Sequence, residues 1–182
     1  MPAERAAAAA SRLFFALWPD HTARERIAAL AQALRRECGG RVPSTARLHL
    51  TLAFIGAATP QRQIALQALT RQLRAAPFEL QFTRVASWPR QRLVWLGTDS
   101  VPAPLAQLVA DLNAQLATAG MRAEKRPLVP HLTLLRDARA PVACLLTSPI
   151  AWRVAEYTLV QSVLSPRPRY EIVERFALGA DI

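Results

Sequence analysis

The feature that most constrains this chain is a tetrapeptide, His-Leu-Thr-Leu, that occurs twice, at residues 49–52 and 131–134. Each copy lies in an apolar segment of strand character. Side chains of a strand alternate between its two faces, so the histidine and threonine of each copy share one face and the two leucines share the other. The polar residues of the two copies are His49, Thr51, His131 and Thr133. The repeat therefore predicts two similar strands, each with a buried face and a polar face.

The rest of the sequence indicates strands and helices that fall into two similar halves. Apolar or alternating segments predict strands at residues 12–18, 48–56, 77–88, 92–98, 131–136, 152–164 and 170–178. Apolar residues at three- and four-residue spacing predict helices at residues 21–38, 60–75 and 104–119. Asp20 is suited to cap the first helix and Thr59 the second, and Gly39 follows the first helix. This pattern predicts an α+β fold.

The length and composition of the chain predict a single domain. Its 182 residues, 52% of them hydrophobic, suffice for one compact core and are too apolar for a disordered protein. No long linker divides the chain, so we expect one domain over residues 12–182 and a flexible leader at residues 1–11. The alanine run at residues 6–10 is too short for a signal peptide or a membrane span. We therefore expect a cytoplasmic protein that does not bind membranes.

The formal net charge of +10 favours phosphate-rich partners. Lys125 is the only lysine, so the positive charge is carried almost entirely by arginines, which are scattered along the chain. A GC-rich coding bias explains such a composition as well as RNA binding does, so the charge alone leaves both explanations open.

Several other residues are expected to be structural or idle. Cys38 and Cys144 are isolated, which favours reduced thiols. His21 stands alone at a helix start and is expected to be exposed. Trp88 and Trp95 flank a turn and are expected to pack in the core of a hairpin, with the wall of a cleft as the alternative. No glycine-rich phosphate loop occurs in the sequence, so no nucleotide cofactor is expected.

The repeated residues suit proton transfer at a phosphate if the two strands meet. An imidazole with a pKa of about 6.5 can take or give a proton near neutral pH, so one histidine can act as general base and the other as general acid. Threonine hydroxyls can hold non-bridging phosphate oxygens. Neither copy includes a carboxylate or a third ligand at metal spacing, so a metal site is not expected.

The paired H-x-T-x motifs resemble those of the 2H phosphoesterase superfamily, and their context resembles its LigT-like branch. That branch comprises the RNA 2′,3′-cyclic phosphodiesterases, also called 2′-5′ RNA ligases. The similar stretches are RLFFAL at residues 12–17, LHLTLAFIG at 48–56, PFEL at 77–80, RPLVPHLTLLR at 126–136 and the closing segment with Ser162 and Tyr170. The sequence departs from the family pattern at Val129, where relatives often have a polar or basic residue, and it lacks an aromatic residue before the first motif.

The resemblance implies a bilobal α+β fold with pseudo-two-fold symmetry, in which two antiparallel sheets flanked by helices enclose a central cleft. It implies metal-independent hydrolysis of RNA 2′,3′-cyclic phosphate ends to 2′-phosphate, with 2′-5′ ligation as the reverse reaction. His49 would act as general acid and His131 as general base, although the residues leave the reverse assignment open. Thr51 and Thr133 would hold the phosphate. We expect a monomer that acts on RNA ends or cyclic nucleotides without a metal or cofactor.

Two further positions match ligand-binding residues of the family, Arg136 for the phosphate and Phe54 for the terminal base. Strict alternation would turn both side chains away from the cleft, because they share parity with the leucines of the repeat. A bulge or a strand end just after each repeat would resolve this conflict. The alternatives are a core aromatic at Phe54 and a solvated arginine at Arg136.

Two other functions remain open from the sequence. One keeps the chemistry and changes the substrate to another small cyclic phosphate, an ADP-ribose cyclic phosphate or a 2′-5′ oligonucleotide. The other is an RNA-binding module without catalysis, in which His49 and His131 only contact phosphate.

Overall fold

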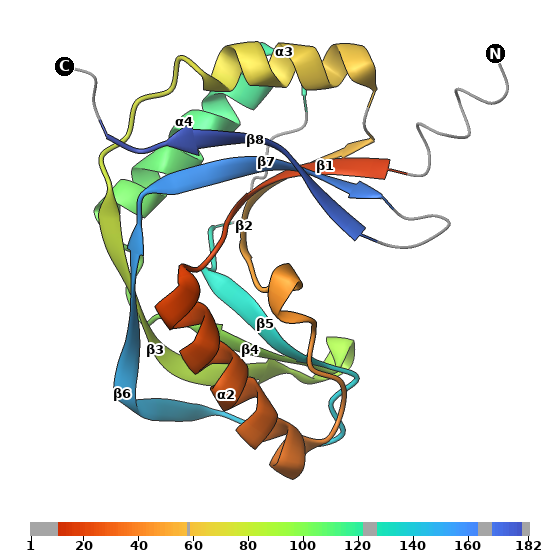
Figure 1. The fold of residues 1–182 in the computed structure, drawn as a ribbon, viewed down its shortest axis with the longest axis vertical. Coiled ribbons are helices and arrows are strands. Elements are labelled where there is room, and N and C mark those ends of the chain that lie inside the picture. The colour runs from red at the N-terminus through yellow and green to blue at the C-terminus, as the bar shows by residue number, and fades with distance from the viewer. Residues whose placement is uncertain (1–10, 58, 122–126, 164–168, 180–182) are drawn as a thin grey trace, which may run out of the picture.

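The computed structural model describes residues 11–57, 59–121, 127–163 and 169–179 (Figure 1). The strands are β1 (Ser11–Leu17), β2 (Leu50–Ala57), β3 (Phe78–Trp88), β4 (Leu93–Gly97), β5 (His131–Arg136), β6 (Cys144–Val154), β7 (Glu156–Val163) and β8 (Arg169–Ala177). The helices are α2 (His21–Cys38), α3 (Pro60–Thr70) and α4 (Ala103–Thr118), with short 3-10 turns η1 (Thr45–Arg47) and η2 (Pro89–Gln91). These elements confirm the α+β fold class. The expected leader lies outside the described residues, except for Ser11, which begins β1.

The strands form one antiparallel sheet of eight strands in the order β6-β3-β4-β5-β2-β1-β7-β8. Between its central strands, β2 and β5, the ladder consists of one residue pair, Leu50 and Leu132. Four strands lie on each side of that junction, so the two predicted sheets are halves of one sheet with a narrow join (Figure 1). The strands that carry the repeated tetrapeptides are therefore neighbours at the centre of the fold.

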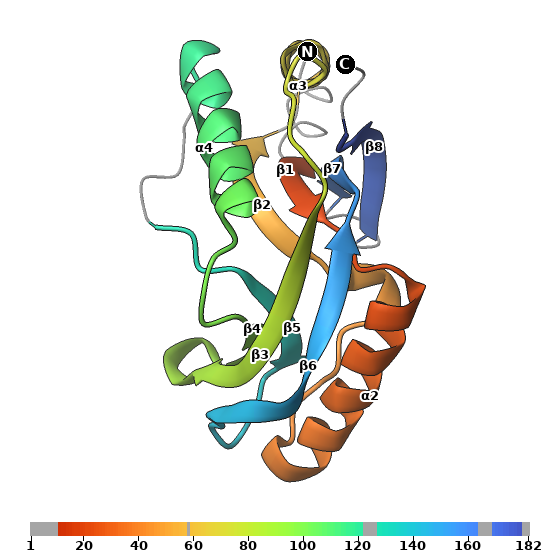
Figure 2. The same ribbon diagram turned by 90° about the vertical axis from the view of Figure 1, so that its left-hand side faces the viewer.

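Each half of the sheet receives a helix from the other half. Helix α2 follows β1 but packs against β5 and β6, and α4 follows β4 but packs against β2 (Figure 2). The buried face of α4 consists of the residues whose spacing predicted it: Leu105, Leu108, Val109, Leu112 and Leu116. Burying a leucine side chain contributes roughly 1.5–3 kcal/mol, so these crossed helices hold the two halves together.

The boundaries of α2 follow from local signals. The side chain of Asp20 accepts a hydrogen bond of 2.8 Å from the backbone N–H of Ala23, as expected of an N-cap. At the other end Gly39 has a φ of 67° and donates its N–H to the carbonyl of Arg35. The predicted span of this helix is confirmed.

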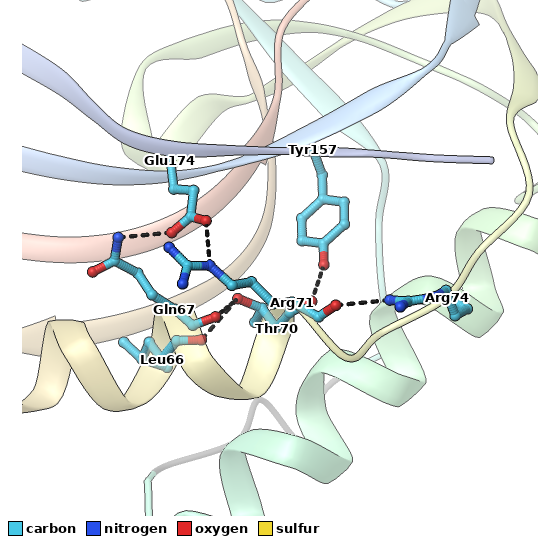
Figure 3. A network of polar contacts seen from close by, with 7 residues as sticks. All are labelled: Leu66, Gln67, Thr70, Arg71, Arg74, Tyr157 and Glu174. Carbon is cyan, nitrogen blue, oxygen red and sulfur yellow. Dashed lines mark hydrogen bonds and ion pairs between the residues drawn. The ribbon is translucent and has the colours of Figure 1, made fainter. Parts of the chain in front are cut away.

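Helix α3 is shorter than predicted and ends at Thr70. The hydroxyl of Tyr157 on β7 donates a 2.9 Å hydrogen bond to the backbone carbonyl of Thr70, which a longer helix would have used for its own next turn (Figure 3). The side chain of Thr70 also bonds the carbonyl of Leu66. The Thr70 carbonyl also accepts the backbone N–H of Leu73, three residues on, at 3.1 Å. The α-helical pattern therefore ends here in a tighter turn, and the Tyr157 hydroxyl supplies the second donor to this carbonyl.

An acidic residue on β8 fastens α3 to the sheet. Glu174 accepts a hydrogen bond of 2.7 Å from the side chain of Gln67 and forms a 2.7 Å ion pair with Arg71 (Figure 3). Both partners come from the C-terminal part of the helix or the residue after it, so the helix end lies over β8.

The prediction of a single strand at residues 152–164 was wrong. The chain forms two strands there, and β6 begins eight residues earlier, at Cys144, and pairs with β3. Most side chains at the start of β6 are exposed, so no alternation of apolar and polar residues indicates a strand. The long neighbouring strand β3 provides the pairing instead.

Candidate functional site

The two repeated motifs line one central cavity of about 780 Å³. His49 immediately precedes β2, and His131 is the first residue of β5. The antiparallel pair Leu50–Leu132 joins the strands one residue after each histidine. Antiparallel pairing therefore brings Thr51 toward His131, and the second threonine of the repeat toward His49. All four predicted residues, His49, Thr51, His131 and Thr133, line the cavity.

Each of the two histidines is oriented by the same backbone contact. The Nδ1 atom of His49 lies 2.7 Å from the carbonyl oxygen of Arg47. The Nδ1 atom of His131 lies 2.8 Å from the carbonyl oxygen of Val129. A carbonyl oxygen only accepts hydrogen bonds, so Nδ1 must carry the hydrogen in both rings. The Nε2 atom of each imidazole is consequently the nitrogen left for proton exchange.

Burial is the main influence on the charge of both imidazoles. It lowers the pKa of His49 below the ordinary value of 6.5, and the hydrogen bond to the Arg47 carbonyl opposes this effect. The nearby charges of Arg136 and His131 lower this pKa further. Burial likewise lowers the pKa of His131, and the hydrogen bond to the Val129 carbonyl opposes it. Both rings are therefore mainly neutral at pH 7, and either can accept a proton.

Aromatic side chains surround His49. The indole of Trp18 stacks on its ring, with centroids 5.1 Å apart and an angle of 19° between the planes. The ring of Tyr170 stands edge-on at 5.2 Å, and that of Phe14 lies at 5.3 Å. These contacts hold the imidazole in one orientation. The family resemblance had indicated Tyr170 and had included Phe14 in a similar stretch without a role, whereas nothing in the sequence had indicated a role for Trp18.

On the other side of the cavity, Trp88 contacts His131. The two rings are 4.6 Å apart at an angle of 69°, and Trp88 in turn packs against the buried Trp95 at 5.3 Å. These tryptophans were predicted to pack in the hairpin core. Trp95 is buried, but it lies 6.4 Å from the ring of His131 and outside the main apolar core. Both tryptophans therefore pack beside the second histidine of the site.

A bulge in each repeat brings Phe54 and Arg136 to the cavity. Along β2 the pairing with β1 skips Leu52, and along β5 the pairing with β4 skips Leu134. These leucines occupy the same position, the last, in the two tetrapeptides. One extra residue in a strand reverses which face each following side chain occupies. Phe54 and Arg136 therefore line the cavity. Phe54 is 53% exposed, which contradicts the alternative of a core aromatic.

Sequence reasoning missed the basic wall of the cavity. Arg41, Ser44 and Arg47 all come from the connection between α2 and β2 and line the cavity with the predicted residues. The guanidinium of Arg47 lies 5.5 Å from the ring of Tyr170, and the hydroxyl-bearing residue Ser162 is also part of the wall. The only signal in the sequence was two arginines in the short segment that precedes the first repeat.

The backbone of Arg41 is fastened to that of Arg136. The two residues exchange both of their backbone hydrogen bonds, at 2.7 and 2.9 Å, outside the named strands. The preceding residue, Gly40, has a φ of 88°, and a Cβ atom there would lie 2.6 Å from the carbonyl oxygen of Arg136. Glycine is therefore required where the α2–β2 connection crosses the end of β5.

The remaining candidates lie outside the site. His21 is exposed at the start of α2, where it is 3.6 Å from Glu25. Cys38 and Cys144 are both free thiols, as predicted. Among the residues that the structure describes, no three histidines, cysteines or carboxylates are grouped as metal ligands would be. Within the same residues, no helix is long and apolar enough to cross a membrane.

Comparison with known proteins agrees with this geometry. The family model of the 2′-5′ RNA ligase superfamily matches residues 18–164. An Escherichia coli protein named RNA 2′,3′-cyclic phosphodiesterase is 36% identical over 173 residues, which cover 92% of this chain and 96% of that protein. An Archaeoglobus fulgidus protein of the same name is 26% identical over 91% of this chain and 99% of its own.

Solved structures have the same fold. The crystal structure of Escherichia coli LigT complexed with 3′-AMP matches with a TM-score of 0.81 at 35% identity, over 93% of this chain and 99% of that chain. A Thermus thermophilus protein matches with a TM-score of 0.79 at 26% identity, over 94% of this chain and 100% of its own. The matched family model, the sequence relatives and the paired motifs in one cavity together show that this chain belongs to the 2′-5′ RNA ligase superfamily.

Proposed function

We propose that this protein is a hydrolase that opens 2′,3′-cyclic phosphates at RNA ends and leaves a 2′-phosphate. The observation that carries the proposal is the pair of histidines in one cavity, each with its Nδ1 hydrogen held by a carbonyl. Two imidazoles with matched orientation supply both proton transfers that such a hydrolysis requires. The relatives named RNA 2′,3′-cyclic phosphodiesterase support this choice of substrate.

In this proposal His131 acts as the general base. Its neutral Nε2 takes a proton from water while the water oxygen attacks phosphorus. His49 enters the step as the imidazolium and gives its Nε2 proton to the departing 3′ oxygen as the P–O3′ bond breaks. The stacked indole of Trp18 supports this assignment, because an electron-rich ring favours the cationic form of His49. The 2′ oxygen keeps the phosphate, and each histidine ends in the other protonation state.

The other predicted residues bind the substrate. The hydroxyls of Thr51 and Thr133 and the guanidinium of Arg136 hold the non-bridging phosphate oxygens, whose negative charge increases as water attacks. The exposed ring of Phe54 stacks on the terminal base. The same groups would catalyse the reverse reaction, which joins RNA ends through a 2′-5′ bond. We also propose that the protein acts as a cytoplasmic monomer and needs no metal or cofactor.

The test is hydrolysis of a 2′,3′-cyclic mononucleotide in EDTA by the wild type, His49→Ala and His131→Ala. Each substitution removes one proton-transfer group, so each should lower kcat by about 10²- to 10⁴-fold. His21→Ala is the matched control, because His21 is an exposed histidine outside the cavity and its loss should leave kcat unchanged.

The product and the metal dependence complete the test. Chromatography against authentic standards should identify only the 2′-phosphate, and EDTA should not lower the rate. Retained activity in both cavity variants would contradict the two-histidine mechanism. Tight RNA binding by a wild type that hydrolyses no cyclic phosphate would instead indicate a binding module.

A further inference from the structure

A second cavity, of about 380 Å³, adjoins the site at Leu93, which lines both cavities. It lies between the turn after β3 and the loop after β5. The other residues that line it are Ser87, Pro89, Arg92, Ala138, Arg139, Ala140 and Pro141. The proposed chemistry uses none of these residues, so this cavity needs another explanation.

A row of residues joined by backbone pairing runs from the first cavity to the second. Arg41 pairs with Arg136, and Arg136 pairs in turn with Leu93 on β4. All three residues line the first cavity, and the second begins on the far side of Leu93. A chain that leaves the phosphate site past Arg136 therefore meets Leu93 and then Arg92.

The wall between the cavities has an excess of positive charge. Arg41 and Arg136 line the first cavity, and Arg92 and Arg139 line the second. The carboxylate among them is Asp137, which forms an ion pair with Arg41 at 2.6 Å. The pKa of Asp137 is lowered first by its hydrogen bond to Arg41 and also by the charges of Arg92 and Arg136. Among the residues of this wall that the structure describes, one carboxylate therefore stands among several guanidinium groups, and the wall attracts anions.

Arg92 is held in place without losing its charge. Its Nη2 atom donates to the carbonyl oxygen of Asp137 at 3.2 Å and its Nε atom to that of Ala138 at 3.4 Å. These acceptors are neutral, so they orient the guanidinium but do not neutralise it. The side chain of Arg139 lies over Gly39, where its Nε atom would be 2.9 Å from an added Cβ. Both arginines are thus placed at the second cavity by contacts within the fold.

Aromatic residues also line the first cavity, and they come from β1, β2 and β8 rather than from β4 and β5. Phe14, Phe54 and Tyr170 line it and suit a base rather than a phosphate chain. An RNA end with a cyclic phosphate continues from the 5′ oxygen of its terminal nucleotide. With the base on these aromatic rings, the preceding chain can extend along the wall formed by Arg41 and Arg136.

We propose that the RNA chain preceding the terminal nucleotide leaves the active site over Leu93 into the second cavity, where Arg92 and Arg139 bind its phosphates. This inference rests on the proposed function and specifies its substrate as an oligonucleotide end rather than a free cyclic nucleotide. Arginine suits this task because its planar guanidinium binds phosphate oxygens in pairs and keeps its charge at any physiological pH.

The test compares a 2′,3′-cyclic mononucleotide with a tetranucleotide that ends in the same cyclic phosphate, using the wild type, Arg92→Gln and Arg139→Gln. Glutamine at residue 92 keeps an unbranched side chain at a position with a φ of 55°. The wild type should have a lower KM for the tetranucleotide. Each substitution should raise that KM about three- to fivefold, as for an exposed ion pair, and leave mononucleotide kinetics unchanged.

Salt dependence gives a second measurement. The slope of log KM against log salt concentration for the tetranucleotide should fall by about 0.7 for each phosphate contact removed. Arg153→Gln is the matched control, because Arg153 is an exposed arginine on the outer strand β6 and lines neither of these two cavities. This variant should retain the wild-type KM for both substrates.

The outcomes separate this inference from the proposed function. Equal KM values of the wild type for both substrates, or equal effects of the substitutions on both, would overturn the inference and leave the proposed function standing. Absence of turnover of either substrate would contradict the proposed function, and this inference would fall with it.

Discussion

The indole ring of Trp18 lies nearly parallel to the imidazole ring of His49, with centroids 5.1 Å apart and 19° between the planes. The same indole donates its Nε1 hydrogen to the carbonyl oxygen of Ala46 at 3.2 Å. The next carbonyl along the chain, that of Arg47, accepts the Nδ1 hydrogen of His49. Trp18 therefore contacts one face of the imidazole and also stabilises the turn whose carbonyl orients the ring.

Replacing Trp18 with leucine should lower kcat and move the basic limb of the pH–rate profile to lower pH. The stacked ring stabilises the imidazolium form of His49, so its loss should lower the pKa of that histidine. A stacking contribution of about 0.7 kcal/mol corresponds to about 0.5 pH unit. Trp18→Phe keeps an aromatic face and should recover most of the shift. A lower kcat with an unchanged profile in Trp18→Leu would show that the ring only supports the fold.

The pH dependence of kcat/KM should be bell-shaped, with its maximum below pH 6.5. Catalysis needs one protonated and one neutral histidine, and burial lowers the pKa of both His49 and His131. A lowered pKa means that the imidazolium loses its proton at a lower pH, so the active form declines as the pH rises through neutrality. Initial rates at constant ionic strength measure this profile. A maximum above pH 7 would contradict the assignment.

Gly40→Ala should raise KM for a cyclic nucleotide several-fold and destabilise the protein by about 1–3 kcal/mol. The added Cβ would lie 2.6 Å from the carbonyl oxygen of Arg136, which must then move with its phosphate-binding side chain. Gly120→Ala is a matched control, because Gly120 also has a positive φ, of 67°, and within the described part of the chain no contact closer than 4 Å is found for the added carbon. The control should lose stability through backbone strain and keep the wild-type KM. An equal KM in both variants would show that Arg136 does not depend on this contact.

Tyr157→Phe should lower the free energy of unfolding by about 1–2 kcal/mol without changing kcat. The substitution removes the 2.9 Å hydrogen bond to the carbonyl oxygen of Thr70, which then keeps only the 3.1 Å bond from the backbone N–H of Leu73 among the described residues. Burial raises the pKa of Tyr157, so its hydroxyl keeps its hydrogen throughout the physiological range. The stack on Phe176, at 4.9 Å and 20°, survives in the variant. Urea unfolding measures the difference, and an unchanged midpoint would contradict the role assigned to this bond.

The sequence by itself determined the features that depend on near neighbours along the chain. The cap at Asp20 and the glycine at Gly39 set the ends of α2, because both act on backbone groups within one helical turn. The repeat of His49 and His131 identified both histidines of the cavity. Identical tetrapeptides predict identical local geometry, and both imidazoles do make the same contact with the carbonyl two residues earlier.

Tertiary structure decided everything that depends on pairing between distant segments. Strict alternation turned Phe54 and Arg136 away from the cleft, and only the registers of β2 with β1 and of β5 with β4 create the bulges that bring them back. The basic wall at Arg41 depends on where the α2–β2 connection crosses β5. The partner strand determines where a bulge forms or a loop crosses, because it provides the hydrogen bonds that fix the register. The local sequence pattern does not identify that partner.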